Sequence, residues 1–130
     1  MAMPERAFTN SGTAAPQSQA DANLSALIES TEDLIWSIDL NYGLLTFNHA
    51  LQRHVETTFG TQAAIGKRPE DLLTPERAAI WPPLFERALT QGPFRAEIPF
   101  PRDRILEMSF HPIVVNGETT GLSMFGKDVT

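Results

Sequence analysis

The last third of the chain contains two segments in which apolar and polar residues alternate and a third segment that follows a hairpin turn, and this pattern limits the possible folds most strongly. The segments cover residues 94–100, 106–113 and 119–127. Such alternation is typical of strands that bury one face. Asn116-Gly117, between the second and third segments, is a favoured two-residue hairpin turn. We therefore expect three consecutive antiparallel strands here.

Two further strands and a helix are expected earlier in the chain. Residues 34–40 alternate, and residues 44–47 are predicted as a second short strand after turn-forming residues. Asn48 is a suitable N-cap for a helix over 49–58, and Gly60 is a suitable residue for its end. Five strands with the helices gathered in the middle of the chain predict an α+β domain with antiparallel hairpins.

A second, longer helix is predicted over residues 75–91. Thr74 is a good N-cap, and Pro75 is well tolerated at the first helical position. Pro82-Pro83 interrupts this helix, because two consecutive residues without an N–H leave the carbonyls one turn earlier unpaired. We therefore expect a kink or a break at the proline pair.

The N-terminal region divides into a tail and a helix. Residues 1–20 are rich in Pro, Ser, Gln and Ala, and such a segment buries too little surface to offset its ordering entropy. We expect a flexible tail here, with the folded domain over 21–130. Residues 22–31, after a possible N-cap at Asp21, predict an amphipathic helix with a narrow apolar stripe. The stripe consists of Leu24, Leu27 and Ile28. We expect it to form part of a homodimer.

Length and composition exclude several classes of protein. The 130 residues fit one domain and carry a formal net charge of −6. This acidic balance argues against nucleic-acid binding, which needs clustered Lys and Arg. The absence of Cys excludes disulfides, thiolate zinc sites and a Cys nucleophile. No apolar run approaches the ~20 residues of a membrane span, and the N-terminus does not look like a secretory signal. We expect a cytoplasmic protein with no membrane partner.

Several short motifs in this order resemble the PAS domain, over about residues 22–130. Leu34–Asp39 resembles the first PAS strand, and residues 45–48 resemble the second strand with its terminal Asn. Residues 65–67 are similar to the Ile-Gly-Lys turn of the family. Residues 108–113 resemble a strand of the last hairpin. Residues 128–130 match the Asp-aliphatic-Thr signature that ends many bacterial PAS domains.

The resemblance implies a fold and a function. The fold would be a five-stranded antiparallel sheet with helices on one face and an N-terminal amphipathic helix. The function would be that of a sensor without catalytic residues of its own, in a bacterial signalling protein. It would detect a small ligand or a partner and relay a conformational signal to a C-terminal output domain. A histidine kinase is the output we favour, which would place the protein in a two-component phosphorelay. No such domain follows Thr130, so we expect a sensor fragment.

Two alternatives remain open. The chain could be a ligand-free PAS dimerisation module of a diguanylate cyclase or a transcriptional regulator. It could also be a small enzyme or carrier with a different α+β fold. An open pocket of about 300 Å³ or more would favour the ligand sensor over the dimerisation module. A cleft with perturbed titratable groups would favour the enzyme.

Cofactors known from other PAS domains are not expected. Haem-binding forms place a proximal His on the long helix, and 75–91 contains none. Flavin photosensors use a Cys, which the chain lacks. His49 and His54 are five residues apart on one helix, not the three or four that share a face, so we expect no metal and two exposed side chains. A small metabolite remains possible.

Catalytic side chains are not expected either. Glu107, Ser109 and His111 share one face of a strand. Neighbours on a strand face are about 7 Å apart, too far for the hydrogen bonds of a catalytic triad. We expect His111 to lie at the surface.

Two sets of residues are predicted to carry the function. The first set is apolar and could line a ligand pocket, although an ordinary filled core is the simpler interpretation. It consists of Phe47, Trp81, Phe85, Met108, Phe110 and Met124. The second set is Asp128 and Thr130, which could fix the angle at which an output helix leaves the sheet and so relay the signal. The alternative for this pair is a solvated chain end.

Overall fold

The computed structural model describes residues 15–130. Its contacts divide the chain into two units, residues 1–31 and 32–130. Helix α1 covers Ala15–Glu29, so it begins earlier than predicted and contains Asp21, which is not its N-cap. Pro16 is compatible with this early start, because proline is tolerated in the first turn of a helix. Residues 1–14 of the predicted tail lie outside the described residues.

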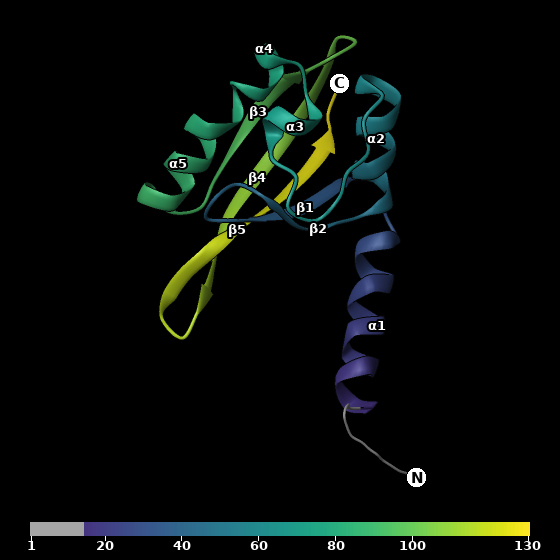
Figure 1. Cartoon of the computed structure of the whole chain (residues 1–130), viewed down its shortest axis with the longest axis vertical. Coiled ribbons are helices and arrows are strands. Elements are labelled where there is room, and N and C mark those ends of the chain that lie inside the picture. The colour runs from purple at the N-terminus through teal and green to yellow at the C-terminus, as the bar shows by residue number, and fades with distance from the viewer. Residues whose placement is uncertain (1–14) are drawn as a thin grey trace. The chain divides into compact units, whose positions relative to one another are not determined.

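The second unit contains five strands and four helices (Figure 1). The elements are β1 (Leu34–Asp39), β2 (Leu44–Phe47), α2 (His49–Phe59), α3 (Pro69–Leu72), α4 (Pro75–Ala78), α5 (Trp81–Gln91), β3 (Phe94–Phe100), β4 (Arg104–Val115) and β5 (Glu118–Asp128). The strands form one sheet in the order β2-β1-β5-β4-β3, and every neighbouring pair is antiparallel. This confirms the predicted five-stranded α+β fold.

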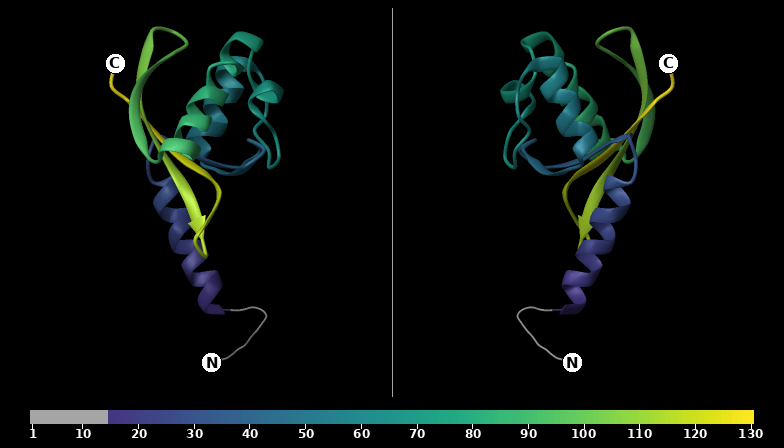
Figure 2. Two further views of the ribbon diagram at one scale, coloured as in Figure 1. Left: turned by 90° about the vertical axis from the view of Figure 1, so that its left-hand side faces the viewer. Right: turned by 90° about the vertical axis from the view of Figure 1, so that its right-hand side faces the viewer.

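One face of the sheet forms the core. On β1, Leu34, Trp36 and Ile38 are all buried, as their alternation predicts. In the register of β1 and β5, Trp36 lies opposite Met124 and Ile38 opposite Leu122. Helix α2 packs against β1, and α5 packs against β4 and β5. The edge-on views show the helices of this unit on one side of the sheet (Figure 2).

The predicted caps of α2 are confirmed. The buried side-chain oxygen of Asn48 accepts hydrogen bonds from the backbone N–H groups of Leu51, at 3.1 Å, and Ile35, at 3.2 Å. Its amide nitrogen donates to the carbonyl of Asp33 at 2.9 Å. Asn48 therefore joins the start of α2 to β1. At the other end, Gly60 has a left-handed φ of 70°, which is the usual conformation of a helix C-cap.

The helix predicted over 75–91 is interrupted, but not where the sequence suggested. The chain leaves the helical pattern at Ala79 and Ile80, between α4 and α5. Pro82 and Pro83 lie in the first turn of α5, where a missing N–H has no helical partner to lose. The proline pair therefore starts a new helix instead of bending an existing one. Thr74 caps α4 as predicted, with its side chain accepting from the Arg77 N–H.

No helix among residues 15–130 is both long enough and apolar enough to cross a membrane. The longest, α1, has 15 residues. In α1, the side chains of Leu24 and Leu27 are 59% and 69% exposed.

Candidate ligand cavity and C-terminal exit

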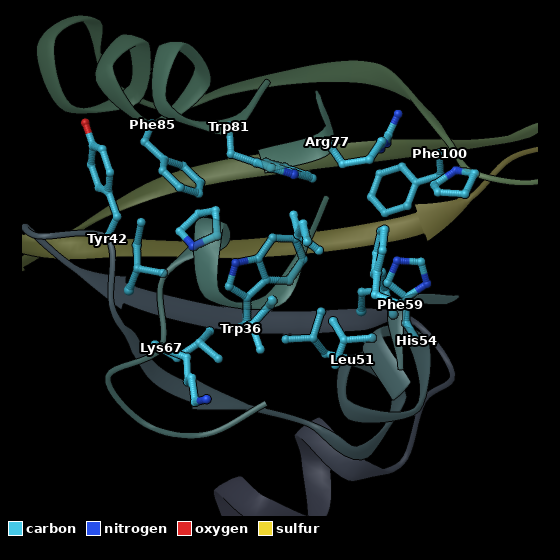
Figure 3. Close-up of a pocket in the computed structure, with 18 residues that line it drawn as sticks. Trp36, Tyr42, Leu51, His54, Phe59, Lys67, Arg77, Trp81, Phe85 and Phe100 are labelled. Carbon is cyan, nitrogen blue, oxygen red and sulfur yellow. The ribbon is translucent and has the colours of Figure 1, made fainter. Parts of the chain in front are cut away.

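An apolar cavity of about 70 Å³ lies between the inner face of the sheet and the helices (Figure 3). Its walls come from β1, β2, α2, the 67–73 segment, α4, α5 and the end of β3. The ten lining residues labelled in the figure are Trp36, Tyr42, Leu51, His54, Phe59, Lys67, Arg77, Trp81, Phe85 and Phe100. A cavity this rich in aromatic rings suits a small apolar group.

The two tryptophans, which are the only ones in the chain, form the middle of the cavity wall. The rings of Trp36 and Trp81 meet edge to face, with centroids 5.7 Å apart and an interplanar angle of 81°. Trp81 also stacks on Phe85 at 6.0 Å. Both indoles are buried. Their rigid rings explain why space remains between them, since flat aromatic groups cannot change shape to fill it.

One end of the cavity is formed by Tyr42 in the β1–β2 turn. Its backbone has a left-handed φ of 70°, and its ring lies 5.1 Å from that of Phe85. Burial, together with the charge of Glu86 and a hydrogen bond to it, raises the pKa of the Tyr42 hydroxyl. Lys67 lies at the same end (Figure 3).

His54 forms the opposite end of the cavity. Its ring packs 5.5 Å from the ring of Phe100 and 6.1 Å from that of Phe59. Burial lowers the pKa of His54 from 6.5 to about 4, and the charges of Arg104, Arg77 and Arg102 contribute. At pH 7 this imidazole is therefore neutral. The expectation that His54 is solvent-exposed was wrong, because α2 turns it inward against two aromatic rings. His49 and His111 are exposed as predicted.

The structure brings only part of the predicted pocket set to the cavity. Trp81 and Phe85 line it. Met108, Phe110 and Met124 instead lie in the packed core beside it, with 0–2% of their surface exposed. Phe47 is partly buried against the same core. A ligand-binding role for any of the six residues stays a prediction.

At about 70 Å³ the cavity is smaller than the roughly 300 Å³ set above for a ligand sensor, so its size does not favour the sensor over the dimerisation module. A water-sized group needs about 10–15 Å³ of such space. The cavity therefore has room for about five such groups, and its 70 Å³ is about half the roughly 150 Å³ of an apolar cavity that binds benzene, so it corresponds to a short alkyl chain.

A polar groove of about 310 Å³ opens beside the cavity. It lies between α2 and the turn that joins β3 to β4. Its lining residues are Glu32, Leu34, Ala50, Arg53, His54, Thr57, Thr58, Arg102 and Arg104. No group of three His, Asp or Glu side chains in residues 15–130 is placed to hold a metal ion.

The residues after the sheet are held by several hydrogen bonds. Asp128 accepts from the Arg104 side chain at 3.0 Å and from the Thr130 N–H at 2.9 Å. The Thr130 hydroxyl accepts from the Ile105 N–H at 2.8 Å, and the Val129 N–H donates to the Ile105 carbonyl at 2.9 Å. The bonds from Thr130 and Arg104 lower the pKa of Asp128 to about 2. The C-terminal segment is thus tied to the start of β4.

The sequence did not lead us to predict several of the cavity residues. Only some of them belong to a sequence pattern that could have indicated them. Trp36 shares the alternating inner face of β1, so it could have been included. Leu51 and His54 are three residues apart on α2, which places them on one helix face. Arg77 and Lys67 gave no signal, because a charged residue in a turn or short helix is ordinarily solvated.

Comparisons with known proteins agree on the fold. No protein-family model matches the sequence, and no curated protein matches it at a significant level. Among solved structures, a PAS domain from Colwellia psychrerythraea is 22% identical, with a TM-score of 0.60 over 86% of this chain and 98% of that one. A sensory box sensor histidine kinase from Vibrio cholerae is 14% identical, with a TM-score of 0.62 over 88% of this chain and 96% of that one.

A third similar structure comes from a different kind of protein. VqmA of Vibrio cholerae, described as a dimer in a study of LuxR-type receptors, is 19% identical, with a TM-score of 0.65. The match covers 84% of this chain and 51% of VqmA. At these identities the likeness establishes the fold, so the chain has the PAS fold that its motifs suggested. A shared fold does not by itself assign a function.

Proposed function

We propose that this chain is a sensor domain that binds a small apolar ligand in the cavity and relays the binding through Asp128 and Thr130 to a C-terminal output domain. A histidine kinase is the output domain that we favour. The similar sensor kinase from Vibrio cholerae supports this choice. The domain itself would not be a catalyst, and its ligand would be a metabolite present in the cytoplasm.

The observation that carries this proposal is the cavity walled by Trp36 and Trp81. Apolar cavities of this kind bind small apolar molecules. With room for about five water-sized groups, the cavity is far too small for haem or flavin, so the proposed ligand is a small metabolite.

Signal relay needs two arrangements of the chain that bind the ligand with different affinity. Residues 128–130, at the end of β5, form the C-terminal exit. The hydrogen bonds of Asp128 and Thr130 to Arg104 and Ile105 are contacts that can be made or released there. Arg104 links this exit to the cavity end of the domain, because it also contributes to the low pKa of His54. Arg104 therefore provides a short route from the His54 end of the cavity to Asp128.

The cavity proposal can be tested with 1-hexanol as a probe, read by intrinsic tryptophan fluorescence. Both tryptophans line the cavity, so filling it should change their emission in a saturable way. Val55→Phe would place a larger side chain into the cavity and should abolish the change. Val114→Phe is the matched control, because Val114 is exposed on the β4–β5 hairpin. A wild-type signal that never saturates, or one equally strong in Val55→Phe, would contradict the proposal.

A dimerisation role is the second candidate, and exposed apolar residues favour it. Leu24 and Leu27 of α1 are exposed, and so is Phe125 on the outer sheet face, at 39%. Burying side chains of this kind contributes about 1.5–3 kcal/mol each before ordering costs. We propose that the chain forms a homodimer through α1.

Light scattering over a concentration series tests the dimer. The full chain should be dimeric, while Leu24→Gln/Leu27→Gln and a variant without residues 1–31 should be monomeric. A full chain that remains monomeric at high concentration would reject the dimer and leave the cavity proposal unaffected.

A further inference from the structure

The groove beside α2 concentrates positive charge on an otherwise acidic protein. Three arginines line it, together with one carboxylate, Glu32, and His54, which is neutral at pH 7. The lining therefore carries a formal charge of +2, whereas the whole chain carries −6. Thr57 and Thr58 add hydroxyl groups to the same surface. Guanidinium groups with neighbouring hydroxyls suit an oxyanion such as a carboxylate.

The three arginines differ in how far their charge is already compensated. Arg53 pairs with Glu32 at 2.9 Å, and Arg104 pairs with Asp128 at 3.0 Å. Arg102 forms no ion pair with any carboxylate of residues 15–130. Its guanidinium donates only to the Thr57 carbonyl, at 3.4 Å. Arg102 thus keeps most of its donors available for a bound anion.

The backbone of the β3–β4 turn holds Arg102 in this position at a cost. Arg102 and the residue after it, Asp103, have left-handed φ values of 67° and 58°. Residues other than Gly rarely adopt this conformation, and Arg is not among those that tolerate it best. The turn nevertheless directs the Arg102 side chain toward the last turn of α2.

The groove and the apolar cavity are neighbours. Leu34 and His54 line both of them. The His54 ring, which packs against Phe59 and Phe100, lies at the boundary where the groove meets the cavity. An apolar chain that covers a neutral imidazole removes it from water at a lower free-energy cost than it would an imidazolium. One molecule could therefore place a charged group in the groove and an apolar group in the cavity.

We infer that the groove binds the carboxylate of a small organic acid, with Arg102 as its main partner, while the apolar part of the same molecule enters the cavity beside His54. This inference rests on the cavity proposal and specifies the ligand: a carboxylate attached to a short alkyl chain.

Arg104 connects this site to the C-terminal exit. It lines the groove and also donates to Asp128. A ligand carboxylate in the groove competes with Asp128 for the same guanidinium. Occupancy therefore weakens the contact that ties the C-terminal segment to β4, which gives the anion a direct effect on the exit.

Three probes that differ in one feature each test the inference at pH 7.5 and constant ionic strength: hexanoate, 1-hexanol and acetate. Tryptophan fluorescence should give a dissociation constant for hexanoate at least about 10-fold below that for 1-hexanol, since hydrogen bonds to a charged group contribute about 1.5–3 kcal/mol. Acetate should produce no saturable change in tryptophan fluorescence. When its carboxylate binds in the groove, it has no alkyl chain that extends into the cavity.

Arg102→Gln should remove the advantage of hexanoate and leave the affinity for 1-hexanol unchanged. Arg95→Gln is the matched control. Its side chain is also exposed, is paired with Glu107 at 3.7 Å, and lies on β3 outside both the groove and the cavity. Arg53→Gln should have a smaller effect than Arg102→Gln, because Glu32 already compensates the Arg53 charge.

The outcomes separate this inference from the cavity proposal. Equal affinities for hexanoate and 1-hexanol, or an unchanged hexanoate affinity in Arg102→Gln, would overturn the anion site while the cavity proposal stands. Acetate binding as tightly as hexanoate would overturn the link between groove and cavity. Failure of both six-carbon probes to bind would overturn the two proposals together.

Discussion

The inner face of the sheet has two halves that are equally apolar but packed differently. Under α5, Met108, Phe110 and Met124 are 0–2% exposed and do not line the cavity. Beside β1 and α2, Trp36 and Trp81 border a cavity of about 70 Å³. The difference lies in shape rather than hydrophobicity. Methionine side chains bend to fill gaps, whereas indole rings are rigid.

Backbone structure adds to this difference. The filled half consists of long paired strands, β4 and β5, which place side chains at regular spacing. The hollow half is bounded by short helices, α3 and α4, and by the loops around them. Such segments adjust their positions at a lower cost than the middle of a sheet. The hollow half is therefore the half in which we propose that a ligand binds, beside the more regular filled half.

The largest expected effect is on the free energy of unfolding, when a large side chain is replaced by Ala in one half or the other. Leu106→Ala, on the inner face of β4, should lower the free energy of unfolding by about 4 kcal/mol, because it opens a new cavity among fully packed side chains. Leu51→Ala, in the cavity wall, should cost only about 2 kcal/mol, at the low end of the usual range. Denaturant unfolding measures both. Equal losses would show that the halves are equally well packed.

The next effect concerns the hydrogen bonds by which Asn48 joins α2 to β1 in the hollow half. Asn48 is fully buried and bonds to the backbone of Asp33, Ile35 and Leu51. Asn48→Ala should lower the free energy of unfolding by about 2–3 kcal/mol, since it leaves buried backbone groups without partners. Asn41→Ala, in the exposed β1–β2 turn, is the control and should change little. A loss below about 0.5 kcal/mol for Asn48→Ala would contradict this role.

Much of the fold followed from the sequence because local patterns and tertiary structure agree. Alternation located β1, β3 and β4, a turn preceded the predicted β2, and Asn116-Gly117 located the last hairpin and with it β5, with φ values of 52° and 81°. Two predictions failed where a residue has more than one role. Proline both breaks and starts helices, so the break beside Pro82 was placed one turn late. The start of α1 was missed because the polar residues 15–20 are compatible with both tail and helix.

A third effect is a pH dependence that arises at the boundary of the hollow half. The unfolded His54 titrates near 6.5 and the folded one near pH 4, because of burial and the nearby arginines Arg104, Arg77 and Arg102. As the pH falls below about 6.5, His54 therefore becomes protonated in the unfolded state before it does in the folded state. Stability should fall as the pH decreases from about 6.5 to 4, by about 2 kcal/mol after allowance for partial exposure.

Urea unfolding at pH 7.5 and 4.5 checks this pH dependence. His54→Phe should remove most of the loss between the two pH values, whereas His111→Gln, at an exposed position, should retain it. A loss that is unchanged in His54→Phe would assign the pH dependence to other groups.

The candidate site was less predictable than the fold, for reasons of side-chain geometry. Apolar residues on one sheet face were grouped correctly, but alternation cannot tell which of them border empty space. Trp81 borders the cavity and Phe110 does not, although both are buried aromatic residues. The role that we propose for Arg102 depends on a left-handed turn that its residue type does not favour. Only the folded arrangement shows these features.

The smallest effect on stability should come from Asp128, where the functional effect should be clear. Its side chain is exposed and accepts from Arg104 and Thr130, so Asp128→Ala should shift the melting temperature little. The test joins residue 130 to the output helix of a reporter histidine kinase and measures kinase activity. Asp128→Ala should lock that activity in one state, because the C-terminal segment is no longer held to Arg104. Asp128→Asn, which still accepts a hydrogen bond but carries no charge, should be intermediate. Normal switching in Asp128→Ala, or unfolding that accounts for any loss, would reject the relay.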